Sequence, residues 1–116
     1  LEHLHGRYRM HIITNGFDEI QAVKLASADI AHFFEHVITN ERAGAKKPDA
    51  RIFQYALEVG EADVAESLML GDNYEADILG AQAVGLATLF YNPSRQPTPQ
   101  PPTYDITHWR EALEIL

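Results

Sequence analysis

The sequence has no cysteine, few basic residues and no long apolar run, and each absence excludes a class of function. Without cysteine there is no disulfide, no thiolate zinc site and no cysteine nucleophile; this is compatible with a reducing compartment and favours the cytoplasm. The chain has 9 Lys and Arg against 17 Asp and Glu, a net charge of -8, which argues against a surface for nucleic acid or for an anionic membrane. No apolar run approaches the roughly 18 residues that a membrane span needs.

The residues that are present have the composition of one globular domain, with 46% hydrophobic and 22% charged residues among 116. Short apolar runs predict strands at residues 10–14, 36–39, 67–70 and 87–91. Helix-forming stretches lie between them, and such alternation favours parallel strands joined by crossovers. We therefore expect an α/β fold with a mainly parallel sheet, whose functional groups gather at the carboxyl ends of the strands.

Four helices are predicted, at about residues 18–28, 48–60, 75–84 and 107–116. Pro48 suits a first helical position, where its missing N–H costs nothing, and Gly60 is expected to end the same helix in a left-handed conformation. Gly85 is the expected C-cap of the third helix, and Thr107 the expected N-cap of the last. The second helix has an apolar stripe that we expect to be buried, formed by Ile52, Phe53, Ala56 and Leu57.

One irregular connection is expected within this single domain. Residues 93–102 contain five of the six prolines, which predicts an extended surface segment. The expected division is a core at residues 1–92, a proline-rich connection at 93–103, and a strand and helix of the same domain at 104–116.

Polar residues follow the expected strands at three places in the chain: Thr14 with Asn15, then Lys47, then Asp72 with Asp77. A hydroxyl and backbone N–H groups at the carboxyl end of a strand can hold phosphate oxygens, and an ammonium group can neutralise the same anion. The two carboxylates would repel phosphate by roughly 4 kcal/mol per charge pair at about 4 Å and an effective dielectric of about 20, so a cation must lie between them. Magnesium fits, because it takes carboxylates, waters and phosphate oxygens as ligands.

These residues lie in three segments that resemble motifs of the haloacid dehalogenase-like hydrolase superfamily: IITNG at 12–16, AGAKKPDARIF at 43–53 and MLGDNYEADILGA at 69–81. The resemblance runs over about residues 10–91. It implies a Rossmann-like three-layer sandwich, a magnesium cofactor and hydrolysis of small-molecule phosphate monoesters. The TNG and GDNxEADI segments are similar in style to nucleotidase-like members of the family.

The resemblance also implies a role for each matching residue. Thr14 is similar to the phosphate-binding hydroxyl, and Asn15 to the neighbouring backbone donor. Lys47 is similar to the lysine that stabilises the transferring phosphoryl group and the charge of the nucleophile. Asp72 is similar to the direct magnesium ligand, and Asp77 to the second acidic residue, which holds a metal-bound water or Lys47.

The first motif of the family, a D-x-D pair that supplies the nucleophile and the acid/base, has no counterpart before Thr14. The resemblance therefore implies that the nucleophile, the central strand that carries it and the substrate-reading cap lie upstream of Leu1, or that another chain completes the sheet. We expect the isolated chain to be inactive and marginally folded, with an incomplete sheet. In that case "phosphatase" describes the parent protein.

Two other functions stay open at this point. A phospho-acceptor receiver domain has a similar length, a parallel sheet, magnesium and a Thr/Lys pair, but its acidic cluster precedes them, whereas Asp72 and Asp77 come last. A non-catalytic remnant that acts in binding or assembly is the second alternative.

Single features of the sequence also have plainer interpretations. A lone Thr-Asn-Gly after a strand is usually a turn, and acidic residues such as Asp77 are common near helix N-termini. His32 and His36 are spaced i, i+4 and suit a zinc pair, but no third ligand is evident, which favours solvated histidines.

Overall fold

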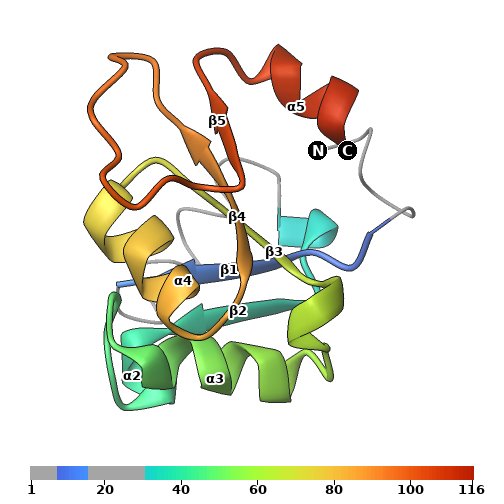
Figure 1. Cartoon of the computed structure of the whole chain (residues 1–116). Coiled ribbons are helices and arrows are strands. Elements are labelled where there is room, and N and C mark those ends of the chain that lie inside the picture. The colour runs from blue at the N-terminus through green and yellow to red at the C-terminus, as the bar shows by residue number, and fades with distance from the viewer. Residues whose placement is uncertain (1–7, 16–30) are drawn as a thin grey trace. The chain divides into compact units, whose positions relative to one another are not determined.

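The computed structural model describes residues 8–15 and 31–116, and the chain divides into two compact units, Leu1–Glu61 and Ala62–Leu116. Figure 1 shows the elements of both units along the chain. Every strand pairing in the described part of the chain is parallel, which confirms the predicted parallel α/β fold. The predicted helix at residues 18–28 lies outside the described residues.

The sheet of the first unit consists of β1 (His11–Thr14) and β2 (His36–Thr39), close to the predicted 10–14 and 36–39. The strands run parallel and in register, so that His11 lies opposite His36 and Thr14 opposite Thr39. The two histidines therefore begin the strands, and the two threonines end them at one edge of the sheet. A 3-10 turn at Ala31–Phe33 precedes β2.

Two helices follow β2 in this unit. The short α2 (Asn40–Ala43) was not predicted; it begins after Thr39, whose side chain accepts a hydrogen bond from the Arg42 N–H at 3.3 Å. Helix α3 (Ala50–Val59) begins after Asp49, whose carboxylate accepts from the Arg51 N–H at 2.9 Å. The prediction that Pro48 opens this helix was wrong by two residues, because Asp49 supplies the capping acceptor and Pro48 lies in the preceding turn.

The apolar stripe of α3 is buried as predicted at Ile52, Phe53 and Ala56, while Leu57 is half-buried. The helix contacts both strands of the sheet and lies along it in Figure 1. Gly60 ends the helix with a right-handed backbone (φ -77°), so the expected left-handed cap was wrong. The positive φ of 51° falls on Glu61 instead. Gly60 is buried, and a side chain there would lie 3.0 Å from His11 Nε2.

The sheet of the second unit has the order β3–β4–β5, formed by Leu68–Gly71, Ala87–Tyr91 and Tyr104–Ile106. The prediction of a strand at 87–91 is confirmed, and the strand predicted at 67–70 begins and ends one residue later. A 3-10 turn at Val64–Glu66 precedes β3. The core around β4 contains Leu89, Ile106 and Ala112, with Leu68, Leu70, Tyr91 and Leu116 packed against them.

The helix predicted at 75–84 is present but opens with a wider turn. Residues Tyr74–Leu79 are π-helical, and α4 (Gly80–Ala83) continues from them. Gly85 follows with φ 86°, which confirms that a left-handed glycine ends this helix. The wide turn begins two residues after Asp72, and π-turns are often found at functional sites.

Helix α5 (Arg110–Ile115) ends the unit, and Thr107 does not cap it. The Thr107 N–H and hydroxyl both interact with the Glu111 carboxylate at 3.3 Å, so the expected cap was wrong because Glu111 engages that side chain. Trp109 is 46% exposed and stacks on Tyr91, with ring centroids 4.4 Å apart. None of the described helices is long and apolar enough to cross a membrane.

Candidate functional site

Thr14, Asn15 and Lys47, predicted to bind phosphate, belong to one local structure in the first unit. Thr14 is the last residue of β1, and Asn15 follows it with an exposed side chain. Asn15 Nδ2 donates to the Lys47 carbonyl at 3.2 Å, and Asn15 Oδ1 accepts from the Lys47 N–H at 2.8 Å. This pair of hydrogen bonds, the Asn15 bridge, ties the backbone of Lys47 to the end of β1.

The loop that carries Lys47 contains a backbone hydrogen bond, from the Asp49 N–H to the Lys46 carbonyl at 2.8 Å. The peptide bond between Lys47 and Pro48 is cis. Lys47 itself is half-buried. The sequence predicted only a backbone role for Asn15, whereas its side chain joins the segment at 12–16 to the segment at 43–53.

The acidic pair lies in the second unit, at the carboxyl end of β3. Asp72 directly follows the strand and is exposed, whereas Asp77 is 5% exposed. Asp77 Oδ2 accepts from the Asn73 N–H at 3.2 Å, and the Asp77 N–H donates to the Asn73 carbonyl at 2.8 Å. Asp77 is thereby fixed beneath the loop, while Asp72 faces solvent.

Gly71 is needed where β3 meets this acidic pair. A Cβ atom on Gly71 would overlap the Cβ and Oδ2 atoms of Asp77. The strand can therefore approach the Asp77 carboxylate this closely only with glycine at position 71. The Gly71-Asp72 sequence at the end of the strand did not predict this contact.

The residues around Asp72 fit a magnesium ion by the chemistry of their donor atoms. A shallow surface pocket of about 300 Å³ is lined by Asp72, Asn73, Tyr74, Glu75 and Gln96. The lining offers carboxylate, amide and phenol oxygens, and no sulfur or imidazole, which suits a hard cation that keeps several waters. Asn73 Oδ1 is occupied as the cap of the π-turn, since it accepts from the Ala76 N–H at 3.0 Å.

The proline-rich segment is held against the same turn. The Tyr74 hydroxyl donates to the Gln100 carbonyl at 2.9 Å and accepts from the Gln100 N–H at 2.8 Å. Gln82 Nε2 donates to the Pro101 carbonyl at 2.9 Å. The segment is therefore fixed to the helix that follows Asp72.

Two further pairs of hydrogen bonds fix the ends of the segment. Asn92, 3% exposed, binds both the N–H and the carbonyl of Gln96 through its side-chain amide, at 2.9 and 3.0 Å. Thr88 and Thr103 exchange N–H to hydroxyl hydrogen bonds at 3.0 and 3.2 Å. Gln96, which lines the pocket, was not predicted as a site residue, and no spacing in the sequence indicates it.

Comparison with known proteins places the chain in a family. The sequence matches the family described as haloacid dehalogenase-like hydrolase over residues 1–91, more than half of the chain. The chain belongs to the haloacid dehalogenase-like hydrolases. Membership of this family confirms the family resemblance predicted from the sequence.

Two curated relatives are, by name, a nucleotidase and a phosphatase. The chain is 36% identical to the pyrimidine 5'-nucleotidase YjjG of Escherichia coli over 119 residues, which cover 100% of this chain and 53% of that protein. It is 43% identical to a glyceraldehyde 3-phosphate phosphatase of Pyrococcus abyssi over 84 residues, which cover 72% of this chain and 35% of that protein. The chain thus spans about half or less of the length of these relatives.

A solved haloacid dehalogenase-like structure has the same fold. The putative hydrolase YfnB of Bacillus subtilis, solved bound to magnesium, superposes with a TM-score of 0.90 at 30% identity. The match covers 98% of this chain and 50% of that one. The parallel α/β fold is therefore that of the family.

Proposed function

We propose that the protein is a magnesium-dependent hydrolase of phosphate monoesters. In this proposal Thr14, Asn15 and Lys47 bind the phosphate group of the substrate, and Asp72 and Asp77 hold the magnesium ion. The observation that carries the proposal is the Asn15 bridge, which ties the backbone of Lys47 to the strand end that bears Thr14. A hydroxyl and a lysine fixed in one local structure suit the binding of a phosphoryl group.

In the first unit, the Thr14 hydroxyl would donate to a phosphate oxygen, and the Asn15 N–H would be a second donor. Lys47 would stabilise the charge that develops on the phosphoryl group during transfer. The Asn15 bridge binds both the N–H and the carbonyl of Lys47, so the backbone from which the Lys47 side chain extends is held in place.

In the second unit, Asp72 would be the direct magnesium ligand, because its exposed carboxylate faces the oxygen-lined pocket. Asp77 would act from beneath, holding a metal-bound water or the loop, since it is buried and already accepts from Asn73. When bound, magnesium would neutralise phosphate charge and polarise the transferring group.

Hydrolysis of the phosphate ester also needs a nucleophile, which these 116 residues do not supply. No D-x-D pair occurs in them, and the family uses such a pair for attack and proton transfer. We propose that a segment upstream, or another chain, supplies this pair and the strand that carries it. Without them the remaining groups would bind rather than turn over substrate, because even a protease without its catalytic triad keeps only about 10³- to 10⁴-fold acceleration.

The substrate class rests on the names of the relatives. One is a nucleotidase and another a phosphatase of glyceraldehyde 3-phosphate, and both substrates are phosphate monoesters. A small phosphate monoester, such as a pyrimidine nucleotide, is therefore the substrate we propose.

The test is phosphate release from p-nitrophenyl phosphate, a pyrimidine 5'-nucleotide and glyceraldehyde 3-phosphate, with and without magnesium. It compares these residues alone with the extended protein, which also contains the upstream segment. We expect activity only in the extended protein, and a raised magnesium requirement when Asp72 is replaced by Ala. Activity in the short chain would refute the placement of the nucleophile. An inactive extended protein would favour a non-catalytic role in binding or assembly.

A further inference from the structure

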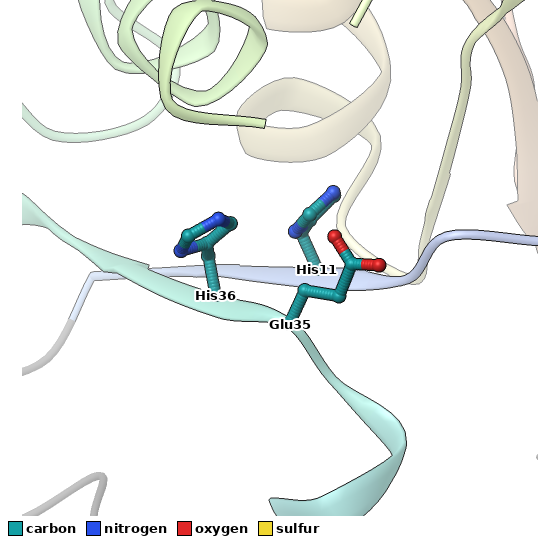
Figure 2. Close-up of side chains that lie close together, drawn as sticks. All are labelled: His11, Glu35 and His36. Carbon is teal, nitrogen blue, oxygen red and sulfur yellow. The ribbon is translucent and has the colours of Figure 1, made fainter. Parts of the chain in front are cut away.

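Three side chains of types that can bind a metal ion lie together at the start of the two strands in the first unit. His11 begins β1, and Glu35 and His36 lie at the start of β2. One potential ligand atom from each of the three lies within 4.8 Å of the others. Figure 2 shows both imidazoles and the Glu35 carboxylate on the same side of the strands.

The strand register produces this group. His11 and His36 are direct neighbours across the parallel pair, and their rings stack with centroids 5.2 Å apart. The backbone also joins Glu35 to β1, because its N–H donates to the Met10 carbonyl at 2.8 Å. The sequence spacing suggested a pair of His36 with His32 and no third ligand; the sheet instead places His11 and Glu35 beside His36.

His11 is the best prepared of the three ligands. Its Nδ1 atom is buried and has no hydrogen-bond partner within the described residues, whereas Nε2 faces Gly60. A buried imidazole nitrogen without a partner is costly unless something binds it. The pKa of His11 is lowered overall, chiefly by burial and next by the neighbouring His36. Glu35 opposes this shift and Arg9 adds to it.

We propose that His11, Glu35 and His36 bind one divalent d-block cation, with Zn²⁺ as the representative ion. Two imidazoles and one carboxylate form a known zinc ligand set that leaves one position for water, and this set is too soft for magnesium. Tetrahedral zinc with bonds of about 2.0–2.2 Å needs ligand atoms about 3.4 Å apart, so the exposed Glu35 and His36 must move inward by roughly 1 Å.

Arg9 competes with the cation for Glu35. Its Nε atom donates to Glu35 Oε2 at 3.1 Å, in an exposed ion pair. Exposed pairs of this kind are weak, typically about 0–1 kcal/mol, so a metal ion can displace the guanidinium. Removal of the Arg9 charge should therefore strengthen binding of the cation.

The cation site is separate from the phosphate-binding group at the other end of the same strands. His11 is the first and Thr14 the last residue of β1, and three residues of strand span roughly 10 Å. Their side chains also face opposite sides of the sheet, because successive strand residues alternate between the two faces and these two are three positions apart. A metal at His11 and His36 would cross-link β1 to β2, which matters because a two-stranded sheet is marginally stable alone.

The test is calorimetric titration of the extended protein with Zn²⁺, in excess Mg²⁺ to occupy hard oxygen sites. His3 and His5 are replaced by Ala throughout, because two histidines so close in sequence can bind zinc themselves. We expect one zinc site, whose affinity falls by at least about tenfold in His36→Gln and in His11→Ala. Loss of a residue that only orients a metal ligand already costs about tenfold, so loss of a ligand should cost at least as much. Glu35→Gln should weaken it, and Arg9→Gln should strengthen it.

The matched controls are His108→Ala, an exposed histidine of the other unit, and His32→Ala. Unchanged zinc affinity in His11→Ala and His36→Gln would refute the site, as would loss of affinity in His32→Ala equal to that in His36→Gln. Far-UV circular dichroism checks that each variant folds. If His11→Ala does not fold, the zinc affinity of His36→Gln, a change at an exposed residue, tests the site by itself. The visible absorption of bound Co²⁺ then reports whether imidazole is a ligand.

Discussion

Asn15 binds the backbone of Lys47 through both ends of its side-chain amide, with Nδ2 to the carbonyl at 3.2 Å and Oδ1 to the N–H at 2.8 Å. A side-chain amide carries both donors and an acceptor, so the single Asn15 side chain can bind the N–H and the carbonyl of the same residue. The bridge makes the position of Lys47 depend on the residue that follows Thr14.

Replacing Asn15 by Asp should reduce kcat/KM of the extended protein by about 100-fold, the cost of a misplacement near 1 Å. The carboxylate keeps the acceptor for the Lys47 N–H but faces the Lys47 carbonyl with a second acceptor, so that half of the bridge is lost. Steady-state assays with p-nitrophenyl phosphate measure the effect. Asn40→Asp, at the start of α2, is the matched control, and equal losses in both variants would argue against the bridge.

Gly71→Ala should destabilise the protein by about 1–3 kcal/mol, the usual cost of overpacking. The added Cβ would overlap Asp77, so the end of β3 or the carboxylate must shift. Magnesium affinity should fall with stability, because Asp72 follows directly. The matched control is Gly44→Asn, where φ is 72° and no atom lies within 4 Å of the added Cβ. Thermal melts and magnesium titrations compare the two, and a stable Gly71→Ala protein would contradict the overlap.

Asp49 should contribute to stability only above its folded-state pKa. Hydrogen bonds from the Arg51 side chain, and then from its backbone, lower the pKa of Asp49 from 3.8 to about 2. Because the folded pKa is the lower one, the contribution is complete well above pH 3.8 and is lost as the pH falls to about 2.

The variant that isolates this charge is Asp49→Asn, which keeps an acceptor for the Arg51 N–H. The difference in Tm between wild type and variant should be constant near neutral pH and vanish near pH 2. It should be small, because the ion pair is exposed. A difference that does not change with pH would show that the Asp49 charge is irrelevant.

Tyr74→Phe should release the proline-rich segment from the π-turn. The hydroxyl accepts from the Gln100 N–H and donates to its carbonyl, and loss of such hydrogen bonds costs about 0.5–1.5 kcal/mol each. Hydrogen exchange of the Gln100 amide should become faster, which mass spectrometry or NMR detects. Tyr104→Phe, at an exposed tyrosine of the same unit, should leave that amide unchanged. Unchanged exchange in Tyr74→Phe would mean that the segment is held elsewhere.

The strands and the motif residues could be predicted from the sequence because both depend on local pattern. The apolar runs of β2 and β4 are short, bounded by polar residues, and begin and end where the pattern does. The motif order also places Thr14, Lys47 and Asp72 at strand ends or loops, and the structure has them there. Their roles stay predictions.

What could not be predicted depends on partners distant in the chain. The Asn15 bridge binds backbone atoms 32 residues away, and backbone atoms are the same for every residue type. The pairing of His11 with His36 follows from a strand register that spacing does not contain. Thr107 looked like a cap because the competing Glu111 carboxylate becomes available only once the last helix has formed.

The close contact between Gly60 and His11 should restrict which residues can occur at these two positions. Because a side chain there would lie 3.0 Å from His11 Nε2 and 3.1 Å from the Ala56 carbonyl, positions 11 and 60 share one volume. Relatives with a bulkier residue at the position of Gly60 should carry a smaller one in place of His11, and those relatives would lack the first ligand of the zinc site. Covariation of these two positions across the family would therefore divide its members into zinc-binding and zinc-free branches.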